Sequence, residues 1–522
     1  MKNGSHNEER TVRRRIRRWL VLTAFLAAGL GTAILLIPKT DSASTVYAQM
    51  EGGQAQPPAE LESPAKDTVP PGQAAPQAVT ERGLSIGGQL MDPLIHAVRE
   101  VRVESPQELA RMEEHVRAQV DRRDVRHAFQ LPTGDEVDCV DIDKQPGMRR
   151  QEMRGQKVLP PPPPVVPPTA ESAPMAPGAM PAPGGPATPP SGQILAAPQA
   201  FLDGGKDARG AARSCPPATI PIRRVTTDEL KSFRNLRDFL RKYPEGSAAP
   251  SRDASPNTAP AFGSSDYHQY AHAARYNVTN YGAFSRLNIW NPKVQVSSEF
   301  SLSQIWVVRG SGNSLETLEA GVQVFPGKYG NSNARLFVYS TSDGYSGNSY
   351  LSGCYNLDCG RFVQTNPNIV IGGAFPNYSV PSGTQYEVEV GWWRVAGAWW
   401  LYVNGTPVGY YPLYLFDANG LQNYASTIDF GGEIIDDRTK HSYHTTTDMG
   451  SSTEYYASAG YGKAAYQRKI WYYSGPNTTA WATGLTPMKT NAYCYNVTTP
   501  TFSQSWGTYF YFNGPGYNTN CK

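Results

Sequence analysis

The chain has 522 residues, enough for about three ordinary domains, but its 44 prolines and 49 glycines indicate that much of it is not packed core. The formal net charge is +3, and seven of the Lys and Arg residues precede Trp19, so the rest of the chain is nearly neutral. A body without a basic stripe argues against a nucleic-acid partner.

Residues 1–48 have the pattern of an export signal. Five arginines between positions 13 and 18 precede an apolar run of about 19 residues from Trp19 to Ile37, and Val46 and Ala48 are small residues of the kind that a signal peptidase accepts. An uncleaved signal anchor is the alternative, because the run is long enough to span a bilayer. Either way, the rest of the chain is expected to be secreted or extracytoplasmic, with the membrane contacted only through this segment.

The next segments alternate between linkers and small folded pieces. Residues 49–85 predict a disordered tether, because they have too little apolar content to form a core. A folded segment is expected over 86–157, where Ser105 and Pro106 predict a helix start. Residues 158–204 begin with a run of prolines and predict an extended polyproline spacer with no core of its own.

A second folded piece is expected over 205–243. Thr226 and Glu229 have the spacing of a capping box, which predicts one helix. Its apolar positions are Leu230, Phe233, Leu236, Phe239 and Leu240. A linker with three prolines, Pro250, Pro256 and Pro260, follows over 244–264.

From residue 265 to 522 the pattern changes to short alternating apolar and aromatic runs separated by Gly, Asn, Ser and Pro. This pattern is typical of an all-β fold, an antiparallel β-sandwich or barrel, and the length suffices for one large two-sheet domain. Two hairpin turns are predicted inside it, one at Ala396-Gly397 and one at Asn404-Gly405.

The six cysteines occur as close pairs and not as metal-ligand clusters, which fits an oxidising compartment. We expect three disulfides and no metal site, because the eight histidines do not gather near the cysteines. The expected pairs are Cys139 with Cys215, Cys354 with Cys359, and Cys494 with Cys521.

Two strands with a similar design carry the candidate catalytic groups. In LEAGVQVF, the pleat sends Leu318 and its alternate neighbours to the core and Glu319 to the outer face. In TIDFGGEIID, the same alternation turns Glu433 outward, again two residues from a glycine. If the two strands lie side by side, two carboxyl groups meet on one sheet face and share a proton, which is equipment for activating water against an amide. Taken singly, each glutamate also fits a solvated surface residue.

The sequence resembles the neprosin family in many ordered motifs, which include CPPATIPIRR, LEAGVQVFPGKYG, RLFVYSTSDGY, GCYNLDC, HTTTDMGS and GYGKAAYQRKI. The resemblance spans roughly 130–522. It implies a secreted glutamic peptidase that cleaves after proline, made as a zymogen with an α+β activation region ahead of a β-sandwich catalytic domain. It also implies that Glu319 and Glu433 are the catalytic pair. The family usually has a tryptophan where this chain has Val322.

Other roles follow from this interpretation. One glutamate acts as base towards water and the other as acid, at acid pH and with no cofactor. Gln323 is a candidate donor to the oxyanion, and Trp392, Trp400 and Tyr402 are candidates for a proline-accepting wall. The expected partners are proline-containing peptides as substrates and the chain's own activation peptide as inhibitor. The rival hypotheses are a secreted carbohydrate- or surface-binding sandwich without catalysis, and a two-carboxylate glycosidase.

Overall fold

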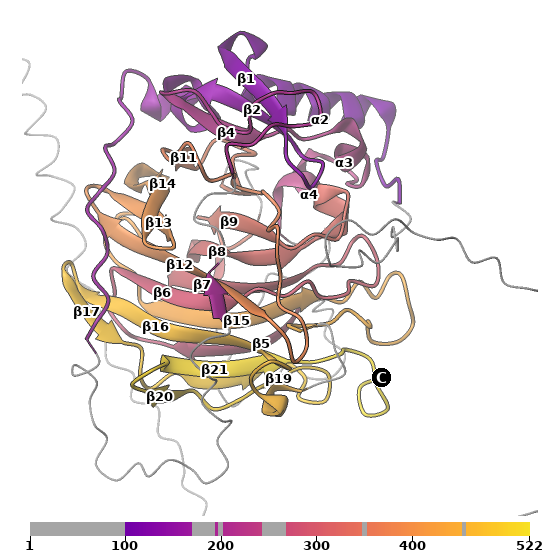
Figure 1. Ribbon diagram of the computed structural model, residues 1–522, viewed down its shortest axis with the longest axis vertical. Coiled ribbons are helices and arrows are strands. Elements are labelled where there is room, and N and C mark those ends of the chain that lie inside the picture. Colours follow the sequence, from indigo (N-terminus) through magenta and orange to yellow (C-terminus); the bar gives the residue numbers. More distant parts are fainter. Residues whose placement is uncertain (1–99, 170–193, 197–201, 243–267, 347–351, 452–455) are drawn as a thin grey trace, which may run out of the picture. The chain divides into compact units, whose positions relative to one another are not determined.

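The computed structural model describes residues 100–169, 194–196, 202–242, 268–346, 352–451 and 456–522. The expected export segment, the tether and the linker with the three prolines lie outside the described residues. No helix within the described ranges is long and apolar enough to cross a membrane. All of these residues belong to one compact unit (Figure 1).

Two separate stretches of the chain, residues 100–157 and 202–242, build one small N-terminal region. Its antiparallel sheet has the order β1-β2-β4, so that the strand after the proline-rich spacer pairs with a strand before it. The disulfide between Cys139 and Cys215 joins the same two stretches. The strands are β1 (Val125–Gln130), β2 (Glu136–Asp141) and β4 (Thr219–Arg223).

Two helices of this region, α2 and α3, begin where the sequence predicted. The Ser105 side chain accepts a hydrogen bond from the Glu108 backbone N–H at the start of α2 (Pro106–Gln119). Thr226 and Glu229 form the predicted capping box. The single helix expected after it is wrong, because the chain breaks and forms α3 (Thr227–Lys231) and α4 (Leu236–Leu240), with Asn235 capping the second.

A two-sheet β-sandwich forms the rest of the structure, as the sequence predicted (Figure 1). Sheet I has seven strands in the order β10-β9-β8-β7-β15-β5-β18. Its strands are β5 (His268–Arg275), β7 (Ser301–Arg309), β8 (Glu316–Val324), β9 (Arg335–Thr341), β10 (Gly353–Tyr355), β15 (Thr427–Ile435) and β18 (Thr486–Lys489). All of its pairings are antiparallel.

Sheet II has the strand order β11-β14-β13-β12-β6-β16-β21-β19, with three short strands at its margins. Its main strands are β6 (Gly282–Asn288), β11 (Val363–Gln364), β12 (Gln385–Val395), β13 (Ala398–Val403), β14 (Thr406–Pro412), β16 (Ala465–Gly475), β19 (Asn496–Val497) and β21 (Gly507–Asn513). The marginal strands are β17 (Thr478–Trp481), β20 (Thr501–Ser503) and β3 (Ile194–Ala196), of which β3 pairs with β12 in parallel. The remaining helix is α5 (Pro326–Tyr329), and 3₁₀ turns lie at Arg122–Asp124, Ile142–Lys144, Pro146–Arg149, Gln151–Met153, Gly312–Ser314, Leu413–Leu415 and Ala457–Ala459.

The pleat of the strands separates a core face from an outer face in sheet I. Leu318, Val322 and Phe430 are buried in the apolar core shared by the two sheets, as the alternation predicted. Val322 therefore bears on core packing and not on the outer face that carries Glu319. The predicted hairpin turns also form, with Ala396-Gly397 and Asn404-Gly405 all at positive φ.

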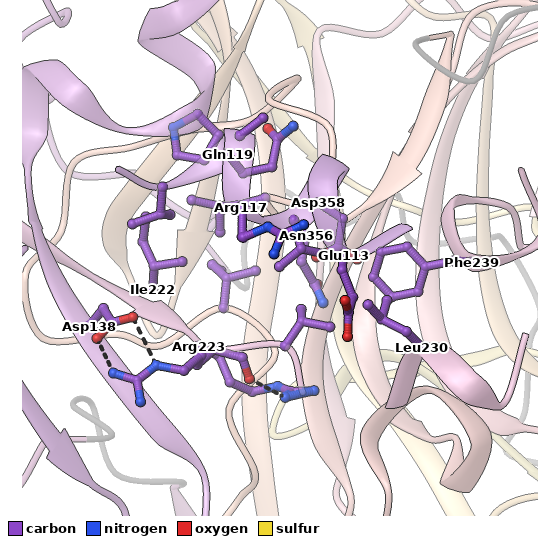
Figure 2. A pocket seen from close by; sticks show the side chains of 18 of the residues that line it. Glu113, Arg117, Gln119, Asp138, Ile222, Arg223, Leu230, Phe239, Asn356 and Asp358 are labelled. Atoms are coloured by element: carbon purple, nitrogen blue, oxygen red, sulfur yellow. Dashed lines mark hydrogen bonds and ion pairs between the residues drawn. The ribbon is translucent and has the colours of Figure 1, made fainter. Parts of the chain in front are cut away.

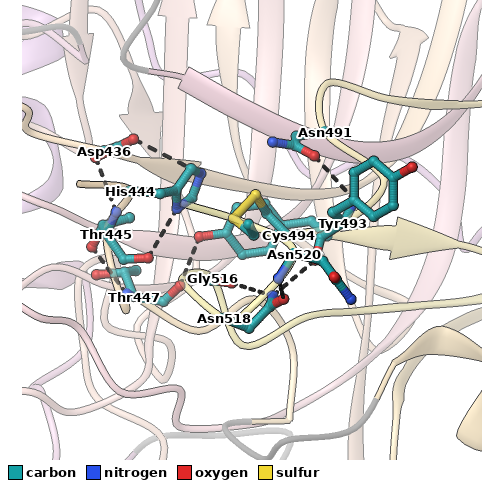
Figure 3. Close-up of a disulfide and its surroundings, with 12 residues drawn as sticks. Asp436, His444, Thr445, Thr447, Asn491, Tyr493, Cys494, Gly516, Asn518 and Asn520 are labelled. Carbon is teal, nitrogen blue, oxygen red and sulfur yellow. Dashed lines mark hydrogen bonds and ion pairs between the residues drawn. A yellow bond between two sulfur atoms is a disulfide. The ribbon is translucent and has the colours of Figure 1, made fainter. Parts of the chain in front are cut away.

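Three disulfides pair the six cysteines as expected. Figure 3 shows the bond between Cys494 and Cys521 beside the segment that follows β15. Next to it, the Tyr495 hydroxyl donates to the backbone oxygen of Thr447 at 2.8 Å. The bond and its neighbours hold the C-terminal segment against the end of sheet I.

Candidate active site

Strands β8 and β15 bring Glu319 and Glu433 to the same outer face of sheet I, but the two strands are not adjacent. Strand β7 lies between them and pairs with both. Glu319 stands opposite Trp306 and Glu433 opposite Leu302, with Gln304 midway between these two β7 residues. The expectation of adjacent strands is therefore corrected, and the inserted strand adds an amide side chain between the carboxylates.

The glycines near the two glutamates are explained by close backbone packing inside the sheet. Gly321 and Gly431 are the residues opposite Gln304 on either side. A Cβ on Gly321 would overlap the backbone oxygen of Ser303, and one on Gly431 would lie 2.6 Å from the Ala271 oxygen. Gly431 also has a φ of +149°, which side-chain-bearing residues rarely adopt. The glycines thus serve the sheet itself.

Lys242, from the end of the N-terminal region, places its ammonium group between the two carboxylates. Its Nζ lies 2.5 Å from Glu319 Oε2 and 2.6 Å from Glu433 Oε2. All three side chains are 0% exposed. Because an unpaired buried charge is costly, one ammonium group between two carboxylates is a strong attachment of this region to sheet I.

Gln304 and three further side chains complete the hydrogen bonding of the pair. Gln304 Nε2 donates to Oε2 of both glutamates, at 3.0 and 3.1 Å. On Glu319, Oε1 accepts from the Tyr345 hydroxyl and from Thr317 Oγ1. On Glu433, Oε1 lies 2.6 Å from His268 Nδ1. Each carboxylate oxygen therefore has at least one partner.

Charge and burial act on Glu433 in opposite directions. Burial by itself raises the pKa of this carboxyl, but the Lys242 charge and the hydrogen bond and charge of His268 outweigh burial and lower the pKa to about 2. Glu433 is consequently ionised in this structure over the whole ordinary pH range. Lys242 is itself held in place, because its backbone makes a hydrogen bond to the Tyr339 side chain.

Helices α3 and α4 cover the outer face around the pair. Leu230 of α3, Phe239 of α4 and Phe233 between the two helices share a buried cluster with Trp306 and Phe325 of the sandwich. The strand alternation therefore predicted correctly that Glu319 and Glu433 lie on the outer face of sheet I. This face is not exposed to solvent around the pair, because the N-terminal region covers it.

A cavity of about 620 Å³ lies beside this cover (Figure 2). Its walls come from α2, β2 and β4 on one side and from α5 and the segment around Asn356 on the other. Among the residues labelled in Figure 2 are Glu113, Arg117 and Asp358. Glu319 and Glu433 are not part of its lining, so the cavity marks the margin of the contact between the N-terminal region and the sandwich.

The structure places the other predicted site residues away from the carboxylates. Gln323 Nε2 donates to the Tyr355 hydroxyl at 3.1 Å and contacts neither glutamate. Trp392 lies in the core between the sheets, because β12 belongs to sheet II. Trp400 and Tyr402 point to the opposite side of sheet II. These aromatics do not form a wall beside the pair.

Sequence reasoning missed Gln304, Tyr345, His268 and Lys242. A signal existed for Gln304, because on β7 it alternates with Leu302 and Trp306 and so interrupts an apolar face. The other three lie far from the glutamates along the chain, and no local pattern singles them out.

Two clusters of potential metal ligands lie apart from the pair in the described part of the chain. One of them, His444 with Cys494 and Cys521, has its two sulfur atoms joined in a disulfide, and the other is the cluster around Glu299. Ligand atoms of Glu299, Asp436 and His441 lie within 4.8 Å of one another. Both oxygens of Glu299 already accept protein hydrogen bonds, from Thr445 and Thr447 among others. The cluster is accounted for as a hydrogen-bonded anchor of the segment after β15.

Comparison with known proteins supplies the family. The profile of the Neprosin family matches residues 297–515, and the profile of the neprosin activation peptide matches residues 128–274. Among solved structures, CG-16, a homodimeric agglutinin from chicken liver, is 11% identical with a TM-score of 0.18, over 31% of this chain and 93% of that one. The two family matches take in more than half of the 522 residues, with the paired glutamates inside the first and Lys242 inside the second. The chain therefore belongs to the neprosin family and is a peptidase zymogen, in which an activation peptide precedes the peptidase.

Proposed function

We propose that the mature protein is a glutamic endopeptidase in which Glu319 and Glu433 activate water, and that it cleaves after proline at acid pH. The observation that carries this proposal is the position of Lys242. One ammonium group from the activation peptide contacts Oε2 of both glutamates, at 2.5 and 2.6 Å. An inhibitor built into the chain thus occupies the point at which the two carboxylates converge.

Removal of Lys242 leaves room at that point for a water molecule. The ionised glutamate takes a proton from this water, and the water oxygen attacks the scissile carbonyl carbon. The protonated glutamate donates a hydrogen bond to the carbonyl oxygen. The tetrahedral intermediate then breaks its C–N bond as a glutamate gives a proton to the leaving nitrogen. The products are a carboxylic acid and an amine, and the pair returns to one shared proton.

Gln304 takes the role that the sequence assigned to Gln323. Its Nε2 reaches Oε2 of both glutamates, so it donates from the same side as the water and is aimed at the region where the oxyanion forms. His268 and Tyr345 act from the outer oxygens and hold the two carboxylates in position. Gln323 remains bonded to Tyr355.

Acid pH follows from the charge of the pair. Without the ammonium group, two carboxylates this close cannot both remain ionised at little cost, so the active form carries one shared proton. Above the pH at which that proton leaves, the acid partner is lost. Activity is therefore highest in acid and falls towards neutral pH.

Cleavage after proline and export from the cytoplasm rest on the sequence. The family resemblance supports proline-containing peptides as substrates. The arginine-rich segment before Trp19 and the three disulfides support a secreted or extracytoplasmic enzyme, with the N-terminal segment as its only membrane contact.

The test is to change each glutamate separately. Glu319→Gln and Glu433→Gln should each lower the rate of cleavage of a proline-containing peptide by roughly 10²–10⁴-fold at acid pH, because each removes one partner of the acid–base pair. Glu389→Gln, on β12 of sheet II, is the matched control and should keep full activity. Circular dichroism reports whether each variant is folded. A folded variant of either dyad residue with normal activity would refute the dyad.

A further inference from the structure

The outer face of sheet II, opposite the core, carries a group of large aromatic side chains that we call the aromatic platform. Its six residues are Trp393, Trp400, Tyr402, Tyr410, Tyr473 and Trp481. They come from five strands, β12, β13, β14, β16 and β17. The rings pack on one another: Trp393 and Tyr473 stack at 4.5 Å, and Trp400 lies 4.8 Å from Tyr410. The six side chains form one large apolar patch on the sheet opposite the one that carries Glu319 and Glu433, and patches of this size mark binding sites.

That occupant is the first part of the proline-rich spacer, residues 158–169, which we call the strap. In Figure 1 it runs as a violet chain from the level of β14 to that of β17. Every third residue of the strap is turned towards the sheet and at least half-buried, while those between are exposed. The residues turned inward are Leu159, Pro162, Val165 and Pro168. A repeat of three residues is the period of a polyproline II helix, so the strap docks one edge of such a helix on the platform.

Hydrogen bonds fix the strap along its whole length. The Leu159 backbone N–H donates to the Tyr410 hydroxyl at 3.2 Å. The Tyr402 hydroxyl donates to the Pro163 backbone oxygen at 2.8 Å, and Trp481 Nε1 donates to that of Thr169 at 2.9 Å. Proteins usually recognise polyproline II helices in this way: aromatic rings pack on the proline side chains, and the polar atoms of these rings form hydrogen bonds to the peptide backbone.

Two of these three hydrogen bonds use backbone oxygens of the strap, which any chain in the polyproline II conformation offers, and the third uses the Leu159 N–H. The strap has no charged side chain, and the platform reads its backbone and the apolar edge of a helix that any proline-rich chain can form. The strap lies within the match to the activation peptide, so its departure would expose the platform.

We propose that the aromatic platform is a second binding site, for proline-rich polypeptides in the polyproline II conformation, and that the strap occupies it until the activation peptide leaves. Because the dyad lies on sheet I and the platform on sheet II, one long proline-rich chain engages the two with different segments. The idea that a bound chain is also a substrate rests on the proposed function. Binding to the platform does not depend on it.

The test measures binding by the full-length chain at neutral pH. Pro162→Asp with Pro168→Asp places charges at two buried strap positions and frees the platform in this variant. A fluorescent synthetic peptide with the sequence of residues 158–169 should then bind saturably, and at least about tenfold more tightly than to the wild-type chain, where the tethered strap competes. The same peptide with alanine at every proline should not bind. A folded double variant that binds neither peptide, or both equally, overturns the proposal.

Single hydroxyl deletions locate the site. Tyr402→Phe in the freed chain should weaken peptide binding about fivefold, because one hydrogen bond to a proline-rich backbone is lost. Tyr509→Phe, in the separate aromatic cluster around Trp506 of the same sheet, should change nothing. Equal effects of the two substitutions would place the peptide elsewhere.

A second measurement needs no strap variant. In the otherwise wild-type chain, Tyr402→Phe should speed tryptic cleavage after Lys157, at the start of the strap, about fivefold, while Tyr509→Phe leaves the rate unchanged. Equal rates for all three chains would show that the platform does not hold the strap. Neither measurement uses peptide-bond hydrolysis by this protein, so a negative result leaves the Glu319 and Glu433 dyad untouched, and an inactive dyad leaves this site untouched.

Discussion

Lys242 decides whether the two glutamates are available. The Lys242 ammonium group and both carboxylates are fully removed from water, and each charge depends on the others for compensation. Breaking a buried ion pair by deleting one partner costs about 3–5 kcal/mol, because a charge is left without a partner in a medium of low polarity. In the proposed mechanism, the latency of the zymogen therefore depends on one side chain, that of Lys242.

Lys242→Met, which keeps the length of the side chain but not the charge, should destabilise the latent chain at pH 7 by about 3–5 kcal/mol. Thermal unfolding measures the loss. Adding Glu433→Gln should recover part of it, since one of the two uncompensated carboxylates is then neutral. Lys231→Met, at a lysine paired with Asp228 on the surface, is the control and should have little effect. A Lys242→Met chain as stable as the wild type would contradict the charge balance described here.

Asp448 makes stability depend on pH at a distance from the dyad. Burial raises its pKa from 3.8 to about 7, against weaker opposing effects from Lys293. The folded chain therefore holds this proton between about pH 4 and pH 7 while the unfolded chain loses it, so stability falls as pH rises through this window. Asp448→Asn should remove this pH dependence, and it should raise the free energy of unfolding by up to about 4 kcal/mol at pH 7 but by little at pH 4. Urea unfolding at the two pH values checks it, and an equal gain at both would contradict the assignment.

At the scale of elements, α3 and α4 act as a lid on sheet I. Their apolar residues pack on the face that carries the dyad, and Lys242 follows directly after α4. The short helices have little stability of their own, so their order depends on this packing.

Phe239→Ala should therefore loosen the lid. Phe239 is 1% exposed, so its truncation should weaken the packing of α3 and α4 on sheet I by about 3–5 kcal/mol. The hydrogen exchange rate of the α3 and α4 amides should then rise at least about a hundredfold at neutral pH. Arg237→Ala, at an exposed position of the same helix, is the matched control. Exchange in β16 of sheet II should not change in either variant. Equal exchange in both variants would show that the lid is held by other contacts.

The disulfide between Cys139 and Cys215 joins the two halves of the activation peptide across 76 residues. In the chain-entropy account, its removal in Cys139→Ala with Cys215→Ala should cost about 4 kcal/mol of stability. Replacement of Cys354 and Cys359, which are 5 residues apart, should cost about half as much. Denaturant unfolding followed by a signal from the N-terminal region measures both, and the reverse order would count against loop closure as the cause.

At the scale of the whole molecule, we propose that acid both releases the activation peptide and favours the proposed activity. The Lys242 charge and the hydrogen bond and charge of His268 hold the pKa of Glu433 at about 2, below the ordinary 4.5, so these two partners together stabilise the latent chain fully above pH 4.5. This contribution, about 3 kcal/mol, is lost as pH falls from 4.5 towards 2. In the proposed mechanism, the same acid supplies the proton that the released pair shares.

Self-processing in acid is the expected consequence. Incubation at about pH 3, where most of this contribution is lost, should cut the chain after Pro250, Pro256 or Pro260, in the segment between α4 and β5, and N-terminal sequencing should find a start between residues 251 and 265. The Glu319→Gln chain should remain intact alone but be cut when active wild-type enzyme is added. A start elsewhere, or cutting of the isolated Glu319→Gln chain, would argue against self-processing.

Local sequence patterns determined a good part of this protein by themselves. Alternation fixed the faces of β8 and β15, cap residues marked the starts of α2 and α3, and turn residues placed two hairpins. These features depend on neighbours a few residues apart, so a single sequence carries them. The similar pattern around the two glutamates made them possible partners, and the resemblance to the neprosin family identified them as the candidate catalytic pair.

Only the tertiary structure decided what surrounds that pair. Insertion of β7 between the two strands, the approach of Lys242 to Glu433 across 191 residues and the seating of the strap on sheet II are long-range events. Their energies come from burial and pairing between segments whose local sequences carry no record of one another. The pleat therefore predicted that Glu319 faces outward, whereas the fold alone decided that this outer face is closed.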